Sequence, residues 1–139
     1  MDGVLVDSNS TGIDNDTKKE YKDQIYNAPD FFKDMTPLVG AIDAYKILCK
    51  QFDTYILTAA PWGNPTAANN KIDWVKKYLP NEAYKRIIIS HNKHLCMGDY
   101  LVDDSTRNGA GEFTGEHIHF GTDTFPDWKS VLDYLSDKS

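Results

Sequence analysis

The sequence predicts an α/β fold with a mainly parallel sheet, and three observations support this class. Short apolar runs alternate along the chain with segments whose apolar residues recur at helical spacing. Three of the four candidate strands are apolar throughout, which is typical of strands covered on both faces. The length of 139 residues suits a single domain, 1–139, with a hydrophobic core of its own. The candidate strands are residues 55–57, 87–89, 100–102 and 118–120.

Helices are predicted between and after these strands. Asn64 and Pro65 form a typical helix start, because Asn caps helix N-termini and Pro is tolerated in the first turn. The segment 8–35 is polar, acidic and weakly patterned, so we expect an insertion there with one short helix at 18–26. The apolar faces of the other helices are Leu38, Ala41, Ile42, Tyr45 and Leu48, then Ile72, Val75 and Leu79, and last Trp128, Val131, Leu132 and Leu135.

Composition limits the classes of partner. The net charge of −6 argues against a nucleic-acid-binding protein, because such proteins carry a basic surface. No apolar run approaches the roughly 20 residues that span a bilayer, and the sequence does not begin like a signal peptide. We therefore expect a cytoplasmic protein without a membrane partner. A phosphate ester remains compatible with the acidic composition, since carboxylate-bound Mg²⁺ and one lysine supply a local positive centre.

Polar side chains follow two of the candidate strands. Thr58 comes directly after 55–57, and Asp103 and Asp104 come directly after 100–102. The carboxyl ends of parallel strands form the ligand-binding edge of such a sheet, so these residues are predicted to lie at the functional edge. Adjacent carboxylates repel each other unless a cation compensates, and Mg²⁺ suits them. The alternative for the two aspartates is a turn, where Asp is common.

Other candidates are weaker one by one. The Thr58 hydroxyl with the backbone N–H of Ala59 could hold phosphate oxygens, although an ordinary turn threonine would look the same. Lys71, in the predicted helix after Pro65, could reach the sheet edge, or it could be a solvated surface lysine. Asp2 begins a short Asp-Gly-Val-Leu motif that a frayed terminus could also contain. The aromatic residues of predicted loops could stack a nucleoside or belong to the core; they are Phe31, Phe32 and Trp62. The four histidines show no metal-ligand spacing.

Together, these stretches resemble the 5'(3')-deoxyribonucleotidases of the haloacid dehalogenase (HAD) superfamily of phosphatases. The resemblance covers nearly the whole chain, because the similar stretches occur in the same order from one end to the other. They are residues 1–7, 31–32, 36–41, 56–62, 71 with 73–79, 101–104 and 125–128.

The resemblance implies a Rossmann-like HAD fold with a small helical cap inserted at about 8–35. It also implies Mg²⁺ as cofactor, a deoxynucleoside monophosphate as small-molecule substrate, hydrolysis through an aspartyl-phosphate, and a homodimer as one option for assembly. Carried over by motif, Asp2 is the general acid/base and offers its backbone carbonyl to Mg²⁺, while Asp104 ligates Mg²⁺ and Asp103 is a neighbouring ligand or orients a water. The resemblance also implies that Thr58, Ala59 and Lys71 bind phosphate and that Phe31, Phe32 and Trp62 line the nucleoside pocket.

The sequence also departs from the family pattern. The family motif reads Asp-x-Asp-Gly, and here Met1 occupies the middle position, so the attacking Asp and the strand before it have no counterpart in the sequence as written. We therefore expect a gap or a stub at the sheet centre, marginal stability and little phosphatase activity. The main alternative is a catalytically inactive nucleotide- or Mg²⁺-binding remnant of the fold, and a weaker one is a receiver-like phosphoacceptor domain.

Overall fold

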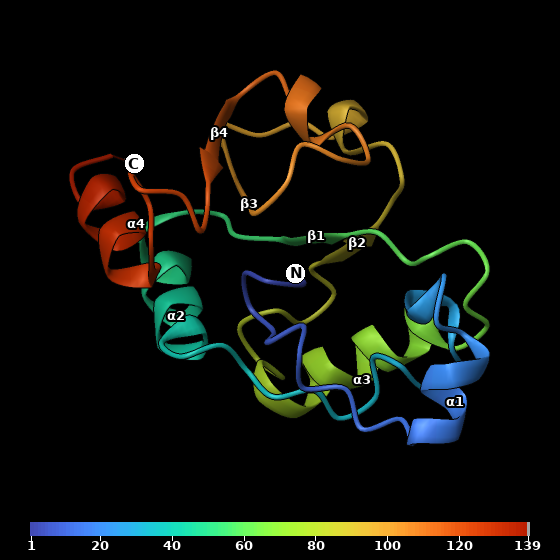
Figure 1. The fold of residues 1–139 in the computed structure, drawn as a ribbon. Coiled ribbons are helices and arrows are strands. Elements are labelled where there is room, and N and C mark those ends of the chain that lie inside the picture. Colours follow the sequence, from blue (N-terminus) through green and yellow to red (C-terminus); the bar gives the residue numbers. More distant parts are fainter. Residues whose placement is uncertain (139) are drawn as a thin grey trace.

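The computed structural model describes residues 1–138 as a mixed α/β structure, which agrees with the predicted class (Figure 1). Four strands and four α-helices follow the chain together with three short 3₁₀ turns at Ile25–Asn27, Lys93–Leu95 and Ala110–Glu112. In chain order the main elements are α1 (Asn15–Glu20), α2 (Ala41–Gln51), β1 (Ile56–Thr58), α3 (Ala67–Tyr78), β2 (Ile87–Ile89), β3 (Tyr100–Asp103), β4 (Glu116–His119) and α4 (Trp128–Leu135).

The strands form two parallel pairs. β1 pairs with β2, placing Ile56 opposite Ile87, and β3 pairs with β4, placing Asp103 opposite His119. All four strands lie within about two residues of the predicted positions. Because both pairs are parallel, Thr58 at the end of β1 and Asp103 at the end of β3 lie at the carboxyl ends of their sheets.

The two pairs are separate sheets, and within residues 1–138 no ladder joins β1 to β3. An apolar cavity of about 660 Å³ lies between these strands and is lined by Leu57 of β1 and Leu101 of β3, among others. The apolar residues 4–6 do not enter it as a strand. Val4 and Leu5 form a turn whose N–H groups donate to the Met1 carbonyl at 3.2 and 2.8 Å.

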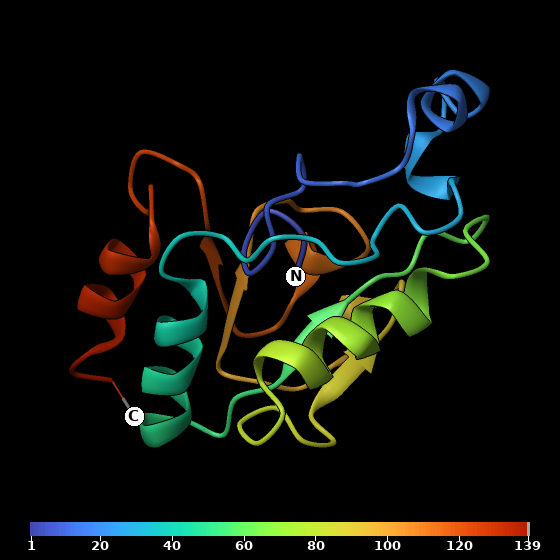
Figure 2. The ribbon, with the colours of Figure 1, turned by 90° about the horizontal axis from the view of Figure 1, so that it is seen from below.

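Helices cover the sheets from two directions. Figures 1 and 2 both show α2 beside α4, while α3 lies along the β1–β2 pair. The buried face of α3 consists of Ala67, Asn70, Lys71, Trp74 and Val75. The predicted start of α3 was wrong by two residues, because Asn64 uses its side-chain amide to donate to the carbonyls of Tyr26 and Ala28. Thr66 stands at the N-cap position instead.

The segment 8–35 differs from the prediction of a single short helix. Asp14 accepts a hydrogen bond from the Thr17 N–H at 2.7 Å, so α1 begins at Asn15 and ends before residue 21. The 3₁₀ turn Ile25–Asn27 follows. Figure 2 shows α1 projecting from the rest of the molecule. The last part of the segment belongs to the core, since Ala28, Phe31, Phe32 and Met35 are buried.

The turn that carries Asp2 is held by the far end of the chain. Trp128, the first residue of α4, is buried and donates from Nε1 to the Val4 carbonyl at 2.7 Å. α4 itself begins at a capping box, in which Asp127 and Ser130 each accept from the backbone of the other. Gly3 adopts a φ of 70°, a conformation that favours glycine. No helix among residues 1–138 has the length and apolar character needed to cross a membrane.

Candidate functional site

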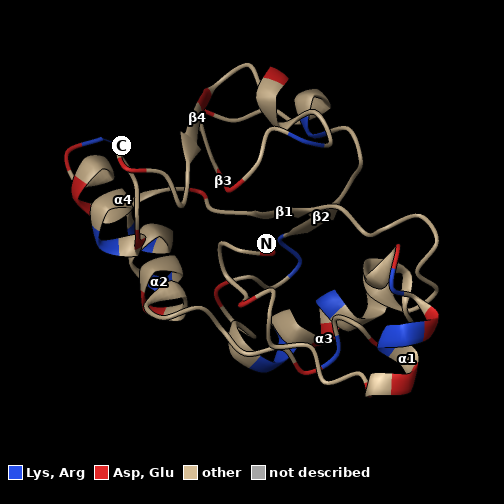
Figure 3. Cartoon of the chain, viewed as in Figure 1, with Lys and Arg blue, Asp and Glu red and all other residues tan. Residues whose placement is uncertain are grey.

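A second cavity, polar and about 520 Å³ in volume, lies at the carboxyl ends of β1 and β3. It is distinct from the larger apolar cavity between the strands, and it contains most of the candidate residues. Figure 3 shows acidic and basic residues interspersed over the ribbon. The cavity is lined by Asp2, Thr58, Ala59, Asp103 and Asp104 on the sheet side, and by Gln24, Tyr26, Asn27 and Phe32 from the segment before α2.

Lys71 lies behind the cavity lining and contacts three of the predicted residues that line it. Its ammonium donates to the Asp2 carboxylate at 3.0 Å, to the Thr58 hydroxyl at 2.9 Å and to the Ala59 carbonyl at 2.6 Å. The side chain is 1% exposed, so Lys71 is not the solvated surface lysine of the alternative reading. Burial lowers the pKa of Lys71, and the negative charge of Asp2 partly offsets this effect. The structure thus brings Asp2, Thr58 and Lys71 into direct contact.

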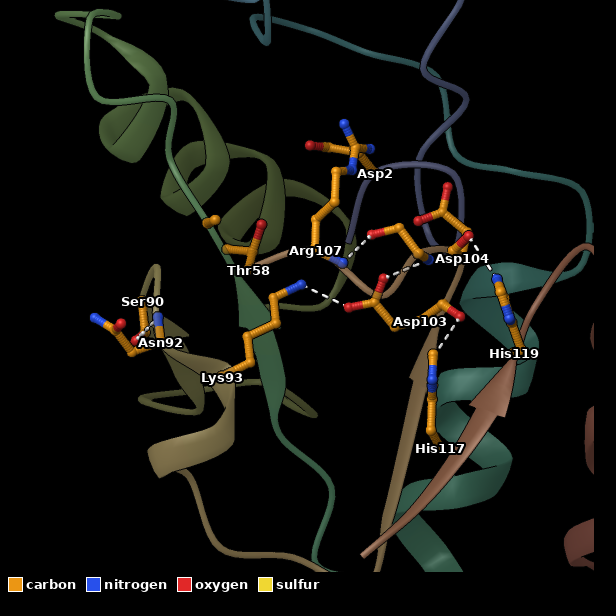
Figure 4. Close-up of polar contacts among 12 residues, drawn as sticks. Asp2, Thr58, Ser90, Asn92, Lys93, Asp103, Asp104, Arg107, His117 and His119 are labelled. Carbon is orange, nitrogen blue, oxygen red and sulfur yellow. Dashed lines mark hydrogen bonds and ion pairs between the residues drawn. The ribbon is translucent and has the colours of Figure 1, made fainter. Parts of the chain in front are cut away.

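A second lysine, Lys93, was not predicted from the sequence. It lies in the 3₁₀ turn Lys93–Leu95 after β2, and its ammonium contacts the Asp103 carboxylate at 2.6 Å (Figure 4). Both side chains are buried, at 7% and 5% exposure. Burial opposes ionisation of Asp103, but the bonds and charge of Lys93 outweigh it, and the pKa of Asp103 is lowered. Lys93 lies four residues beyond the end of β2, so the rule that selected residues directly after a strand did not select it.

Asp104 carries the least compensated charge of the site. Its pKa is raised, first by burial and then by the neighbouring Asp103 carboxylate. The Asp104 carboxylate lies against Gly3, where a Cβ atom would stand only 2.1 Å from Oδ2. The turn that bears Asp2 and the turn that bears Asp104 are therefore in contact. A side chain at position 3 would separate them.

The donors present fit a magnesium ion. Asp2 Oδ1 is buried and has no hydrogen-bond partner, although Oδ2 of the same carboxylate is held by Lys71. A buried carboxylate oxygen without a partner is costly unless a cation or water completes it. Residues 1–138 contain no group of three His, Cys, Asp or Glu side chains that forms a full cage. Mg²⁺ does not need one, because it keeps several waters and takes one or two carboxylates.

The predicted aromatic wall is present in part. Phe32 lines the cavity and lies 4.5 Å from the Lys71 ammonium, measured to the ring centroid. Phe31 packs behind it as a core residue, with ring centroids 4.9 Å apart. Trp62 lies outside the cavity lining, is 93% exposed and rests against His91. The loop after β1 turns Trp62 outward, and spacing in the sequence does not encode that direction.

Two histidines of β4 reach the acidic turn after β3. The Nε2–H of His117 donates to the carbonyl of Asp103 at 3.1 Å, and that of His119 donates to the carbonyl of Asp104 at 3.0 Å (Figure 4). The two rings stack at 5.1 Å between centroids with an interplanar angle of 20°. The spacing of these histidines showed no metal-ligand pattern, and in the structure both contact backbone oxygens.

The chain matches known proteins over most of its length. Residues 6–130 match the profile of the family described as 5' nucleotidase, deoxy (pyrimidine), cytosolic type C protein. A protein of Vibrio phage KVP40, assigned as a 5'(3')-deoxyribonucleotidase, is 53% identical over 142 residues, covering 100% of this chain and 83% of the phage protein. The human cytosolic-type 5'(3')-deoxyribonucleotidase is 35% identical over 100 residues, covering 69% of this chain and 50% of the human protein.

Proposed function

The chain belongs to the 5' nucleotidase, deoxy (pyrimidine), cytosolic type C family, and from this premise we propose that it acts on the phosphate group of deoxynucleoside monophosphates. The observation that carries the proposal is the convergence of a hydroxyl, two buried lysines and three aspartates at one polar cavity. The residues are Thr58, Lys71, Lys93, Asp2, Asp103 and Asp104.

Phosphate binding is assigned to the end of β1. Thr58 and Ala59 line the cavity, and the Lys71 ammonium donates to the hydroxyl of the first and the carbonyl of the second. A buried ammonium interacts strongly with an anion because little water screens it. Lys93 lines the same cavity and adds a second positive charge. These groups support a site for one phosphate monoester, and Phe32 with Tyr26 offers apolar surface for the attached nucleoside.

Asp2 and Asp104 are proposed as the residues that hold Mg²⁺, with Asp103 beside them. The raised pKa of Asp104 supports this, because a cation would relieve it. Asp2 would offer its backbone carbonyl to the ion, so that Oδ1 of its carboxylate, which has no partner within residues 1–138, stays available for proton transfer. When bound, Mg²⁺ would offset the negative charge of the phosphate. Asp103 is already paired with Lys93, so its contribution is to hold the turn that presents Asp104.

The proposed route is an aspartyl-phosphate mechanism in which Asp2 serves as acid and base. Asp2 is in contact with Lys71, which holds one oxygen of its carboxylate and leaves Oδ1 without a partner in the described residues. The attacking carboxylate of the family would stand directly before Met1, whose amino nitrogen is buried near Asp2, Lys71, Lys93 and Asp103. Burial lowers the pKa of that amino group to about 6. We also propose that the apolar cavity between β1 and β3 is the place of one further strand of the family fold, which would lead into this position.

The alternative function is binding of the nucleotide without hydrolysis. It would use the same proposed phosphate and Mg²⁺ ligands without a chemical step at the phosphorus atom. The two functions differ in one measurement, which is turnover of a bound nucleotide. Both require the same binding site.

The first prediction tests this site through metal binding. Asp104→Asn is expected to weaken Mg²⁺ binding by at least about 10-fold, because ligand charge sets the affinity of such sites for hard cations. Isothermal titration calorimetry with Mg²⁺, with and without dUMP, measures the change. Asp133→Asn is the matched control, since Asp133 is exposed on α4 and pairs only with Lys129 in the described structure. Equal Mg²⁺ affinity of the Asp104 and Asp133 variants would contradict the assignment.

A further inference from the structure

Hydrogen bonds hold the Asp103 side chain and the carbonyls of Asp103 and Asp104 in the acidic turn after β3. Asp103 is held by its side chain, through Lys93 at 2.6 Å and through the Ser105 N–H at 3.1 Å. Its carbonyl accepts from the Phe120 N–H of the β4 end at 3.0 Å and from His117 at 3.1 Å. The direction in which Asp104 projects is therefore set by the backbone on either side of it.

His119 donates a hydrogen bond to the Asp104 carbonyl, which the ladder between β3 and β4 does not reach. β3 ends at Asp103, so the Asp104 carbonyl lies beyond the ladder between β3 and β4. The ring of His119, which stands opposite Asp103 in that ladder, reaches past the strand end and donates from Nε2 to this carbonyl at 3.0 Å. The stacked ring of His117 limits the rotation of His119. The two residues are i and i+2 on one face of β4, as their alternation requires.

We propose that His119, with His117 stacked on it, is a positioning residue that aims the Asp104 carboxylate at the cavity. His117 fixes the carbonyl of Asp103, and His119 fixes the carbonyl of the next residue, so the peptide unit that bears Asp104 is held from the β4 side. The Asp104 carboxylate is then directed against Gly3, beside Asp2. Neither imidazole is a metal ligand in this proposal, because each Nε2 is committed to a backbone oxygen.

This inference rests on the proposed function only where it concerns the metal. Partners that orient metal ligands from outside the coordination shell typically change metal affinity 10–100-fold when they are removed. His119 acts on the backbone of Asp104 rather than on its carboxylate, so the lower end of that range is expected. The effect should depend on the N–H donor and not on the ring, since the donated hydrogen bond is what holds the carbonyl.

The test compares His119→Leu with His119→Gln. Leucine removes the donor, whereas glutamine keeps an amide N–H near the end of a side chain of similar reach. His119→Leu is expected to weaken Mg²⁺ binding about 10-fold by isothermal titration calorimetry, and His119→Gln is expected to stay within about threefold of the unaltered protein. His94→Leu, a change at an exposed histidine in another turn, is the control. Equal affinities for the leucine and glutamine variants would overturn the proposal, whether both are weak or both are unaltered.

A second readout separates this inference from the proposed function. In the metal-free, ¹⁵N-labelled protein at about pH 8, Nε2 of His119 should carry a proton, because it donates to the Asp104 carbonyl. The backbone amide signals of Asp104 and Ser105 should move in the leucine variant and return toward their original positions in the glutamine variant. Failure of the unaltered protein to bind Mg²⁺ would count against the metal site alone. The positioning role would be overturned if Nε2 of His119 carried no proton, or if the amide signals of Asp104 and Ser105 did not shift in His119→Leu.

Discussion

A chain extended by an apolar strand that ends in Asp directly before Met1 is expected to hydrolyse dUMP or dTMP at least about 10³-fold faster than residues 1–139 alone. A nucleophilic route needs its attacking carboxylate, and loss of one member of a catalytic unit commonly costs several orders of magnitude in rate. The Met1 nitrogen is already buried near Asp2, Lys71, Lys93 and Asp103, so a residue joined to it enters the polar cavity. Release of inorganic phosphate from each nucleotide is the measurement.

The matched control is the same extension ending in Asn. Both extensions can pair with β1 and β3 across the apolar cavity, so both should raise the free energy of unfolding by satisfying edge N–H and C=O groups, at roughly 1–3 kcal/mol for each group that is otherwise buried without a partner. Only the Asp form should gain activity. Equal turnover by the two extensions, or turnover of about 1 s⁻¹ by residues 1–139 alone, would show that another group attacks the phosphate.

The second large effect is expected at the buried pair of Lys93 and Asp103. Lys93→Met leaves the Asp103 carboxylate, 5% exposed, without its counter-charge, and breaking a buried pair from one side typically costs about 3–5 kcal/mol. The double variant Lys93→Met with Asp103→Asn removes both charges, while Asn can still accept from the Ser105 N–H. It should therefore recover much of the stability that the single variant loses. Urea unfolding of the three proteins measures the difference.

The exposed pair of Lys129 and Asp133 provides the comparison. These side chains are 83% and 67% exposed at an N–O distance of 2.8 Å, so Lys129→Met should cost no more than about 1 kcal/mol. If Lys93→Met and Lys129→Met had similar effects, the Lys93 pair would be as solvated as the surface pair, against its burial. A double variant less stable than Lys93→Met would instead show that the Asp103 carboxylate stabilises the fold through partners other than Lys93, such as the Ser105 N–H.

The strands and the residues at their carboxyl ends could be predicted from the sequence, because both depend on local sequence pattern. Apolar runs located all four strands, and the rule that ligands bind at the carboxyl ends of parallel strands selected Thr58, Asp103 and Asp104. Lys71 could be predicted because a helix that follows β1 must pack back against the sheet. Its burial, and its contacts with Asp2 and Thr58, follow from that packing.

The positions of the other site residues could not be predicted, because they depend on loops and pairings that are set by contacts between distant residues. Lys93 lies in a three-residue turn with no periodicity, and a lone lysine is most often on the surface, so nothing local marked it as buried. Trp62, which was expected to line the nucleoside pocket, lies outside the polar cavity, because its loop turns the side chain outward. The reach of His119 to Asp104 depends on the register of β4 against β3, and short strands do not reveal their register in advance.

The bond between Trp128 and Val4 has a consequence for how the protein is made. It joins residues 124 positions apart and fixes the turn that carries Asp2. Ribosomes add about 5–20 residues per second, so the N-terminal turn waits for several seconds before its anchor is synthesised and emerges. During that time Val4 and Leu5 lack the surface that buries them. The turn that carries Asp2 should thus be among the last parts of the chain to become ordered during synthesis, after α4 docks.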